Sequence, residues 1–155
     1  MRILVVDDDA TVRLVLTRML EALGHEVTVA GDGEEAWRIL RLDHHSVVIA
    51  DWLMPALDGI ALCKRIRAAA LPGGYVYLIL LTSKTEREDR RAGLAAGADD
   101  FLVKPPDRDS LTERLGVAER ILTMEAKLRE ANELLDRRRQ HEIEIGGTIQ
   151  RALLM

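Results

Sequence analysis

Short apolar runs alternate with longer amphipathic segments over the first two-thirds of the chain. Five of these runs are rich in Val, Ile and Leu and are apolar at nearly every position. Runs of this kind are typical of strands in a parallel sheet that is covered on both faces. The five predicted strands are residues 3–6, 26–30, 47–50, 75–81 and 101–103.

Between these runs, apolar residues recur at intervals of three and four, which indicates amphipathic helices. The first such segment runs from Val12 to Leu23, and Gly24 is its predicted C-cap. The others are residues 34–42, 60–68 and 86–96. Five strand–helix repeats predict an α/β fold with a doubly wound parallel sheet. In such sheets the ligand binds beyond the carboxyl ends of the strands.

From Asp107 onward the pattern changes to that of one long helix. Its apolar residues are spaced 3, 4, 3, 4, as in the seam of a coiled coil: Ile121, Met124, Leu128, Ala131 and Leu135. The next seam positions, Arg138 and Glu142, are charged, and Ile145, Ile149 and Ala152 then resume the seam. A helix over residues 110–141 would be roughly 50 Å long, so we expect its second half to project from the domain. The predicted division is a domain over residues 1–120 and a coiled-coil linker over residues 121–155.

Composition excludes several classes of protein. Of the 155 residues, 48% are apolar and only 3% are aromatic, so the core must be aliphatic. The net charge of −4 gives no general attraction to nucleic acid or to anionic lipid. Cys63 is the only cysteine, which excludes an internal disulfide and favours a reducing compartment. No stretch approaches the roughly 20 apolar residues that span a bilayer. We therefore expect a cytoplasmic protein with no nucleic-acid or membrane partner.

Polar residues follow four of the five predicted strands. They are Asp7, Asp8 and Asp9 after the first strand, Asp51 after the third, Thr82 after the fourth and Lys104 after the fifth. Because these strand ends meet at one edge of the sheet, we expect the side chains to lie close together. Clustered carboxylates are unfavourable without a cation, and their hard oxygen ligands suit Mg²⁺. A metal, a hydroxyl and a lysine around Asp51 form a predicted phosphoryl site, with Asp51 as the nucleophile.

At this point the sequence resembles the receiver domain of bacterial two-component response regulators. The motifs that carry the resemblance are Leu4-Val5-Val6-Asp7-Asp8, Asp51-Trp52-Leu53-Met54-Pro55 with Asp58-Gly59, Leu81-Thr82-Ser83, Gly97-Ala98-Asp99-Asp100 and Val103-Lys104-Pro105. They occur in the order of the family and cover about residues 1–120. Each motif is common by itself, but together they are highly specific. The resemblance implies a flavodoxin-like (βα)5 fold, with the C-terminal helix extended into a coiled-coil linker.

The resemblance also implies a role for each site residue. Asp51 would accept a phosphoryl group from a histidine kinase. Thr82 would donate a hydrogen bond to a phosphoryl oxygen, and Lys104 would form an ion pair with the phosphoryl group. Asp8, Asp51 and the backbone carbonyl of Leu53 would bind Mg²⁺ directly, and Asp7 would act mostly through water. Phe101 would be the aromatic switch that moves inward as Thr82 shifts toward the phosphate. The readout surface would then be the fourth helix, the fifth strand and the fifth helix.

The last dozen residues carry a weaker resemblance. Residues 142–154 resemble the segment that leads into PP2C-type serine/threonine phosphatase domains of bacterial stress-response regulators, although Gly146-Gly147 departs from that helical pattern. This predicts that the chain is the front part of a longer protein, which would then be a phosphatase. The receiver alone would catalyse only its own phosphotransfer and dephosphorylation. A diguanylate cyclase output is the alternative, but its usual Asp-x-Leu-Thr-Gly linker ending is absent.

Other interpretations compete with a phosphorylated switch that dimerises through the heptad seam. A stand-alone adaptor with a vestigial pocket belongs to a different class. A haloacid-dehalogenase type of enzyme needs a second Asp two residues after the nucleophile, where Leu53 stands.

Structural interpretations also compete for single residues. Asp7 and Asp8 could form a strand-end turn, Asp9 could be a helix N-cap, and Phe101 could be plain core. The four histidines, His25, His44, His45 and His141, have no ligand spacing and are predicted to be surface residues.

Overall fold

Five parallel strands form one sheet in the order β2-β1-β3-β4-β5. The computed structural model describes residues 1–83 and 87–154. The strands are β1 Arg2–Val6, β2 Glu26–Ala30, β3 Val47–Asp51, β4 Tyr77–Thr82 and β5 Asp100–Val103. The helices are α1 Ala10–Ala22, α2 Gly33–Leu42, α3 Gly59–Ala68, α4 Arg87–Ala96 and α5 Arg108–Leu154. The predicted flavodoxin-like fold, with a long C-terminal helix, is confirmed.

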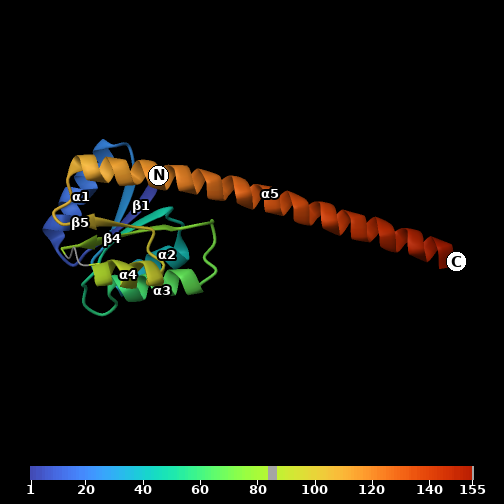
Figure 1. Ribbon diagram of the computed structural model, residues 1–155, viewed down its shortest axis with the longest axis horizontal. Coiled ribbons are helices and arrows are strands. Elements are labelled where there is room, and N and C mark those ends of the chain that lie inside the picture. The colour runs from blue at the N-terminus through green and yellow to red at the C-terminus, as the bar shows by residue number, and fades with distance from the viewer. Residues whose placement is uncertain (84–86, 155) are drawn as a thin grey trace. The chain divides into compact units, whose positions relative to one another are not determined.

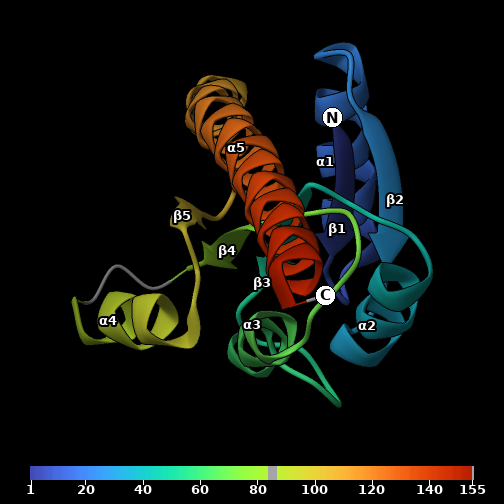
Figure 2. The same ribbon diagram turned by 90° about the vertical axis from the view of Figure 1, so that its right-hand side faces the viewer.

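The sheet divides the core into two layers because successive side chains of a strand point to opposite faces. In β1, Leu4 and Val6 pack with the buried residues of α2 and α3, whereas Ile3 and Val5 pack with those of α1 and the first turns of α5. Figures 1 and 2 show these helices on the two sides of the sheet. Burial on both faces explains why β1, β3 and β4 are apolar at consecutive positions, whereas the edge strand β2 is partly exposed and contains Glu26 and Thr28.

Aspartates begin the helices that follow the strands. The side chains of Asp9, Asp32 and Asp58 accept hydrogen bonds from backbone amides in the first turns of α1, α2 and α3. Asp107 accepts one from the amide of Ser110 at the start of α5. These amides have no partner within the helix, so each cap satisfies a donor that would otherwise be unpaired. The N-cap interpretation of Asp9 is therefore confirmed.

Several predicted boundaries change. The strand predicted from residue 75 begins at Tyr77. Tyr75 precedes it, and the Tyr75 hydroxyl donates a hydrogen bond to the Asp99 carboxylate. Helix α1 has its C-cap at Leu23, and Gly24 follows with φ +90°. The predicted start of the fourth helix at residue 86 lies outside the described residues. The long helix continues through Gly146 and Gly147, beyond its predicted end at residue 141.

The surface prediction for the histidines is wrong for His45. This side chain is only 1% exposed, and its Nε2 lies 3.0 Å from the hydroxyl oxygen of Thr28 on β2. Its other ring nitrogen lies 3.2 Å from the backbone carbonyl oxygen of Asp43. Both ring nitrogens therefore have polar partners, which makes burial of the imidazole tolerable.

The chain divides into two compact units, Met1–Leu122 and Thr123–Met155. The first contains the sheet and its covering helices. The second consists of the rest of α5, and every side chain described in it, from residue 123 to residue 146, is exposed. Of the helices in the part of the chain that the structure describes, each is too short or too polar to cross a membrane.

Candidate functional site

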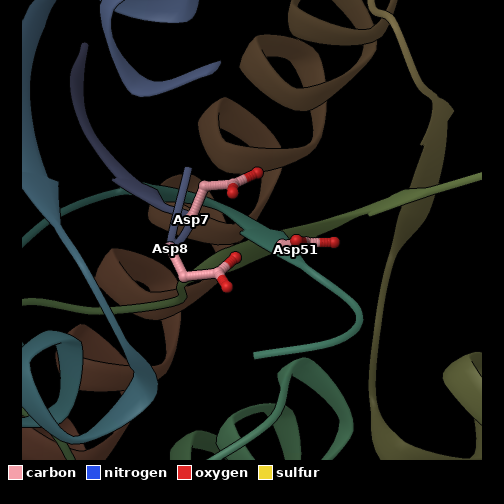
Figure 3. Close-up of side chains that lie close together, drawn as sticks. All are labelled: Asp7, Asp8 and Asp51. Atoms are coloured by element: carbon pink, nitrogen blue, oxygen red, sulfur yellow. The ribbon is translucent and has the colours of Figure 1, made fainter. Parts of the chain in front are cut away.

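The carboxyl ends of β1 and β3 bring three aspartates together. Asp7 and Asp8 directly follow β1, and Asp51 is the last residue of β3. Each offers one carboxylate oxygen, and these oxygens all lie within 4.8 Å of one another. Figure 3 shows the three side chains at this edge of the sheet. The predicted convergence of these carboxylates is therefore present.

Lys104 connects two of these carboxylates. Its ammonium nitrogen Nζ lies 2.8 Å from Asp51 Oδ2 and 3.0 Å from Asp7 Oδ2. The amide of Lys104 donates to the Thr82 carbonyl, which continues the pairing of β5 with β4 up to the site. Burial alone would lower the pKa of Lys104, but its close contacts with the carboxylates of Asp51 and Asp7, and their negative charges, outweigh burial and raise its pKa. Lys104 is therefore a firmly held cation within the pocket.

Asp7 is the most deeply buried acid of the site. It is 0% exposed, and burial, together with the charge of Asp51, raises the pKa of its carboxyl. The Asp9 amide donates to Asp7 Oδ1, whereas Oδ2 has no hydrogen-bond donor among the described residues. The 3.0 Å contact of Oδ2 with Lys104 is thus an ion pair without hydrogen-bond geometry. A buried acceptor left in this state is costly, and a bound cation would satisfy it.

Glycine at position 59 allows α3 to start against the Asp51 backbone. A Cβ at Gly59 would lie 2.4 Å from the carbonyl oxygen of Asp51, so no other residue fits without a shift. The Gly59 amide donates to the carbonyl of Trp52, and the Trp52 amide donates to the carbonyl of Leu81 on β4. These contacts hold the backbone of the segment that directly follows Asp51.

A small cleft of about 20 Å³ opens beside Asp51, which is room for about one water molecule. Its lining consists of Asp51, Trp52, Leu53, Thr82 and Ser83. Thr82 is the last residue of β4 and is only 3% exposed. The cleft therefore places the predicted hydroxyl and the predicted carbonyl-bearing residue beside the predicted nucleophile.

Phe101, the predicted aromatic switch, stands on β5 and is partly buried. Its ring stacks on the ring of Trp52, the residue after Asp51. Cys63 lies in the core on α3, where burial raises the pKa of its thiol to about 12. That thiol takes no part in the site, as an inert core cysteine should.

Sequence reasoning missed Arg13. One of its guanidinium nitrogens donates to the backbone carbonyl of Asp7 at 2.7 Å and so ties α1 to the loop that carries the acids. It also missed the fit of Gly93 on α4 against the Phe101 ring. A basic residue in an amphipathic helix and a glycine near a helix end are both common, so neither stands out in the sequence.

Comparison with known proteins agrees with this geometry. Residues 3–116 match the family described as response regulator receiver domain. The chain is 40% identical over 114 residues to the "Probable transcriptional regulator ycf27" of Cyanophora paradoxa, with 74% of this chain and 46% of that protein covered. It is 41% identical to the response regulator MprA of Mycolicibacterium vanbaalenii, with 74% and 48% covered. The match thus spans about half the length of these relatives.

Solved structures show the same fold. The chemotaxis protein CheY4 of Vibrio cholerae superposes with a TM-score of 0.71 at 31% identity, covering 76% of this chain and 97% of that one. The receiver domain of the sensor histidine kinase PA1611 of Pseudomonas aeruginosa gives a TM-score of 0.67 at 33% identity, covering 77% and 94%. That structure has a magnesium ion coordinated in its active site cleft.

Proposed function

The chain belongs to the family of response regulator receiver domains of two-component signalling, and on that premise we propose that Asp51 accepts a phosphoryl group from a histidine kinase in a reaction that needs Mg²⁺. The observation that carries this proposal is the pair of contacts from Lys104 Nζ to Asp51 and Asp7, at 2.8 and 3.0 Å. These contacts place a positive charge beside the carboxylate nucleophile, where a transferring phosphoryl group requires it.

The residues of the pocket fit a magnesium ion. Mg²⁺ takes oxygen ligands and usually binds one or two carboxylates together with water and phosphate. Asp8 and Asp51 would hold it directly with the Leu53 carbonyl, and Asp7 would act through water. Two observations support this assignment. Oδ2 of Asp7 accepts no hydrogen bond within the described part of the chain, and the PA1611 receiver holds magnesium. When bound, the ion supplies positive charge to the phosphoryl oxygens.

In the transfer itself, a carboxylate oxygen of Asp51 attacks the phosphorus atom of a phosphohistidine. The new O–P bond forms as the N–P bond breaks, and the electron pair stays on the imidazole nitrogen, which then takes up a proton. Lys104 pairs with the phosphoryl oxygens, while the hydroxyl of Thr82 donates a hydrogen bond to one of them. The small volume of the adjacent cleft limits water access to the acyl phosphate.

Phosphorylation would act as a local change of charge on an element with two states. Thr82 would move toward the phosphate and Phe101 would move inward behind it. The change would be read on α4, β5 and the first turns of α5. The stacking of Phe101 on Trp52, the residue after the phosphoacceptor, supports this role for Phe101.

The proposed output is a PP2C-type phosphatase beyond the helical linker of residues 121–155, with a diguanylate cyclase as the alternative. A stand-alone adaptor is the remaining candidate. The resemblance of residues 142–154 to the segment before such phosphatases favours the first. The heptad spacing of α5 supports a parallel homodimer. Sedimentation that finds only monomer at high concentration, with and without a phosphoryl analogue, would contradict that dimer.

Trp52 provides the test of phosphoryl transfer. Its fluorescence should respond to Mg²⁺ and then to beryllofluoride, because it adjoins Asp51. Asp51→Asn should abolish the second response, and a small phosphodonor should add one phosphoryl mass to the wild type only. Trp37→Phe is the matched control, since Trp37 is on α2 and its removal should leave both responses in place. An unmodified Asp51 after treatment with the donor and Mg²⁺ would favour the adaptor with a vestigial pocket.

A further inference from the structure

The second unit of the chain carries an apolar stripe along one side of α5. Met124, Leu128, Leu135 and Ile145 are 69%, 57%, 53% and 46% exposed, and Ala131 lies between them at the same spacing. Steps of three and four residues keep these side chains on one line of the helix. Exposure of these apolar side chains to water is unfavourable. A second helix with the same apolar spacing could bury them.

Two charged residues interrupt this apolar stripe. Arg138 and Glu142 fall at the seam positions between Leu135 and Ile145, and both are exposed. Within the part of the chain that the structure describes, neither forms an ion pair, although they are four residues apart. Pairs at this spacing are weaker when the basic residue comes first, so the single helix gains little from joining them.

We propose that a second copy of this chain covers the stripe in parallel and in register, and that Arg138 of each copy pairs with Glu142 of the partner subunit. The proposal rests on the homodimer inferred above and specifies its partner, direction and register. In a parallel pair, successive seam layers of the two helices lie next to each other. The two-fold axis then creates two identical ion pairs across the seam.

The charges at the borders of the stripe agree with this direction. Arg120 stands four residues before Met124 and Glu125 stands one residue after it. In a parallel pair in register, Arg120 of one copy faces Glu125 of the partner subunit across the seam. The next facing positions bring no like charges together, because they combine Lys127 with an asparagine, Leu134 with an arginine and His141 with a glycine.

A charge swap tests whether the pair forms between copies. Arg138→Glu makes both seam positions acidic, and Glu142→Arg makes both basic, so each variant alone should dissociate about tenfold more readily through like-charge repulsion. Mixed in equal amounts, the two variants should form the heterodimer in excess over either homodimer, since both ion pairs across the seam are then restored, one in its original orientation and one with its charges exchanged. Native mass spectrometry of the mixture, with one variant isotope-labelled, measures this preference. A statistical mixture would overturn the proposal.

A disulfide measures the direction. In the dimer, the cysteine of Ala131→Cys should form a disulfide with the same cysteine of the second copy. In a parallel pair in register, the two positions 131 face each other across the seam. An antiparallel pair that joins Arg138 to Glu142 would place position 131 opposite position 149, and no such bridge would form. Cys63→Ala in the same background is the control, although the native thiol is only 2% exposed.

The outcomes separate this inference from the proposed function. A wild-type chain that stays monomeric would remove the homodimer altogether. A dimer without heterodimer preference or without the bridge at position 131 would remove only the paired seam. Neither result touches phosphorylation, which the Trp52 response to beryllofluoride reads independently. Circular dichroism of each variant confirms that the helix is intact.

Discussion

The ring of Phe101 stacks on the ring of Trp52, with centroids 6.3 Å apart and ring planes 28° apart. On another side of Phe101 lies Gly93 of α4, where a Cβ would stand 2.6 Å from the ring carbon Cε1 and 3.2 Å from a methyl group of Leu80. The aromatic ring therefore occupies a slot between the residue next to Asp51 and a helix of the proposed readout surface.

This slot predicts an unusual sign for Gly93→Ala. In a helix interior this change ordinarily stabilises by about 1 kcal/mol. Here the new methyl group would collide with the Phe101 ring, so we expect a loss of roughly 1–2 kcal/mol in the free energy of unfolding, as for other overpacked sites. The Trp52 emission should shift as well, because its stacking partner is displaced.

The control for this prediction is the same substitution in a Phe101→Ala background. With the ring removed, Gly93→Ala should become stabilising by about 0.5–1 kcal/mol, as the helix propensity requires. Urea unfolding of the four proteins of this cycle gives the coupling between the two positions. Equal effects of Gly93→Ala in both backgrounds would show that the glycine does not position the ring.

Lys104→Ala should destabilise the metal-free protein. The change leaves Asp7 and Asp51 without their shared cation, and we expect a loss of about 2 kcal/mol, below the cost at a fully buried pair because Lys104 is partly exposed. Mg²⁺ should raise the melting temperature of this variant more than that of the wild type, since the ion replaces the missing charge. Lys64→Ala, at an exposed position of α3, is the matched control and should change neither quantity.

Asp7→Asn should stabilise the metal-free protein at neutral pH. The folded protein raises the pKa of this carboxyl, so it binds a proton more tightly when folded. The stability that the group contributes is complete below its ordinary pKa of about 4 and is lost as the pH rises through the raised value. At pH 7 the charge therefore opposes folding, and its removal should help.

The advantage of Asp7→Asn should shrink as the pH falls below about 4, where the wild-type carboxyl is protonated in both states. Thermal unfolding in EDTA between pH 3 and pH 8 would follow the difference. Adding Mg²⁺ should reverse the order of the two proteins at neutral pH, because only the wild type keeps the full acidic cluster. Asp8→Asn is the comparison, and its effect without metal should be smaller because Asp8 is exposed.

Arg67 makes several contacts at the edge of the sheet that lies away from the aspartate cluster. Its guanidinium donates to the Gly97 and Val76 carbonyls and to the Asp99 carboxylate, at 3.0, 2.7 and 2.7 Å, and lies over the Tyr75 ring. Arg67→Ala should cost about 2–4 kcal/mol of unfolding free energy, because Asp99 loses its ionic partner and the carbonyls lose donors.

Arg67→Lys should recover little of that loss, since an ammonium group cannot reach several acceptors in one plane. Both variants should keep the wild-type affinity for Mg²⁺ in Trp52 titrations, because they alter the edge of the sheet away from the acids. A parallel loss of metal binding would instead show that the two edges of the sheet are coupled.

The pattern along the chain was enough to predict the sheet and the edge at which its chemistry lies. Strands buried on both faces must be apolar at consecutive positions, and helices that cover them must be apolar every three or four residues, so both periods are visible without coordinates. The acids after β1, Asp51, Thr82 and Lys104 then share an edge because all parallel strands end there.

Only the tertiary structure decided which groups touch. The sequence does not distinguish Asp7, which is fully buried, from Asp8, which is exposed, because both follow the same strand and the turn of the loop sets them apart. The burial of His45, the donor from Arg13 and the fit of Gly93 against Phe101 depend on residues far apart in the chain. Their distances follow from the packing of whole helices on the sheet, and a local period contains no information about that packing.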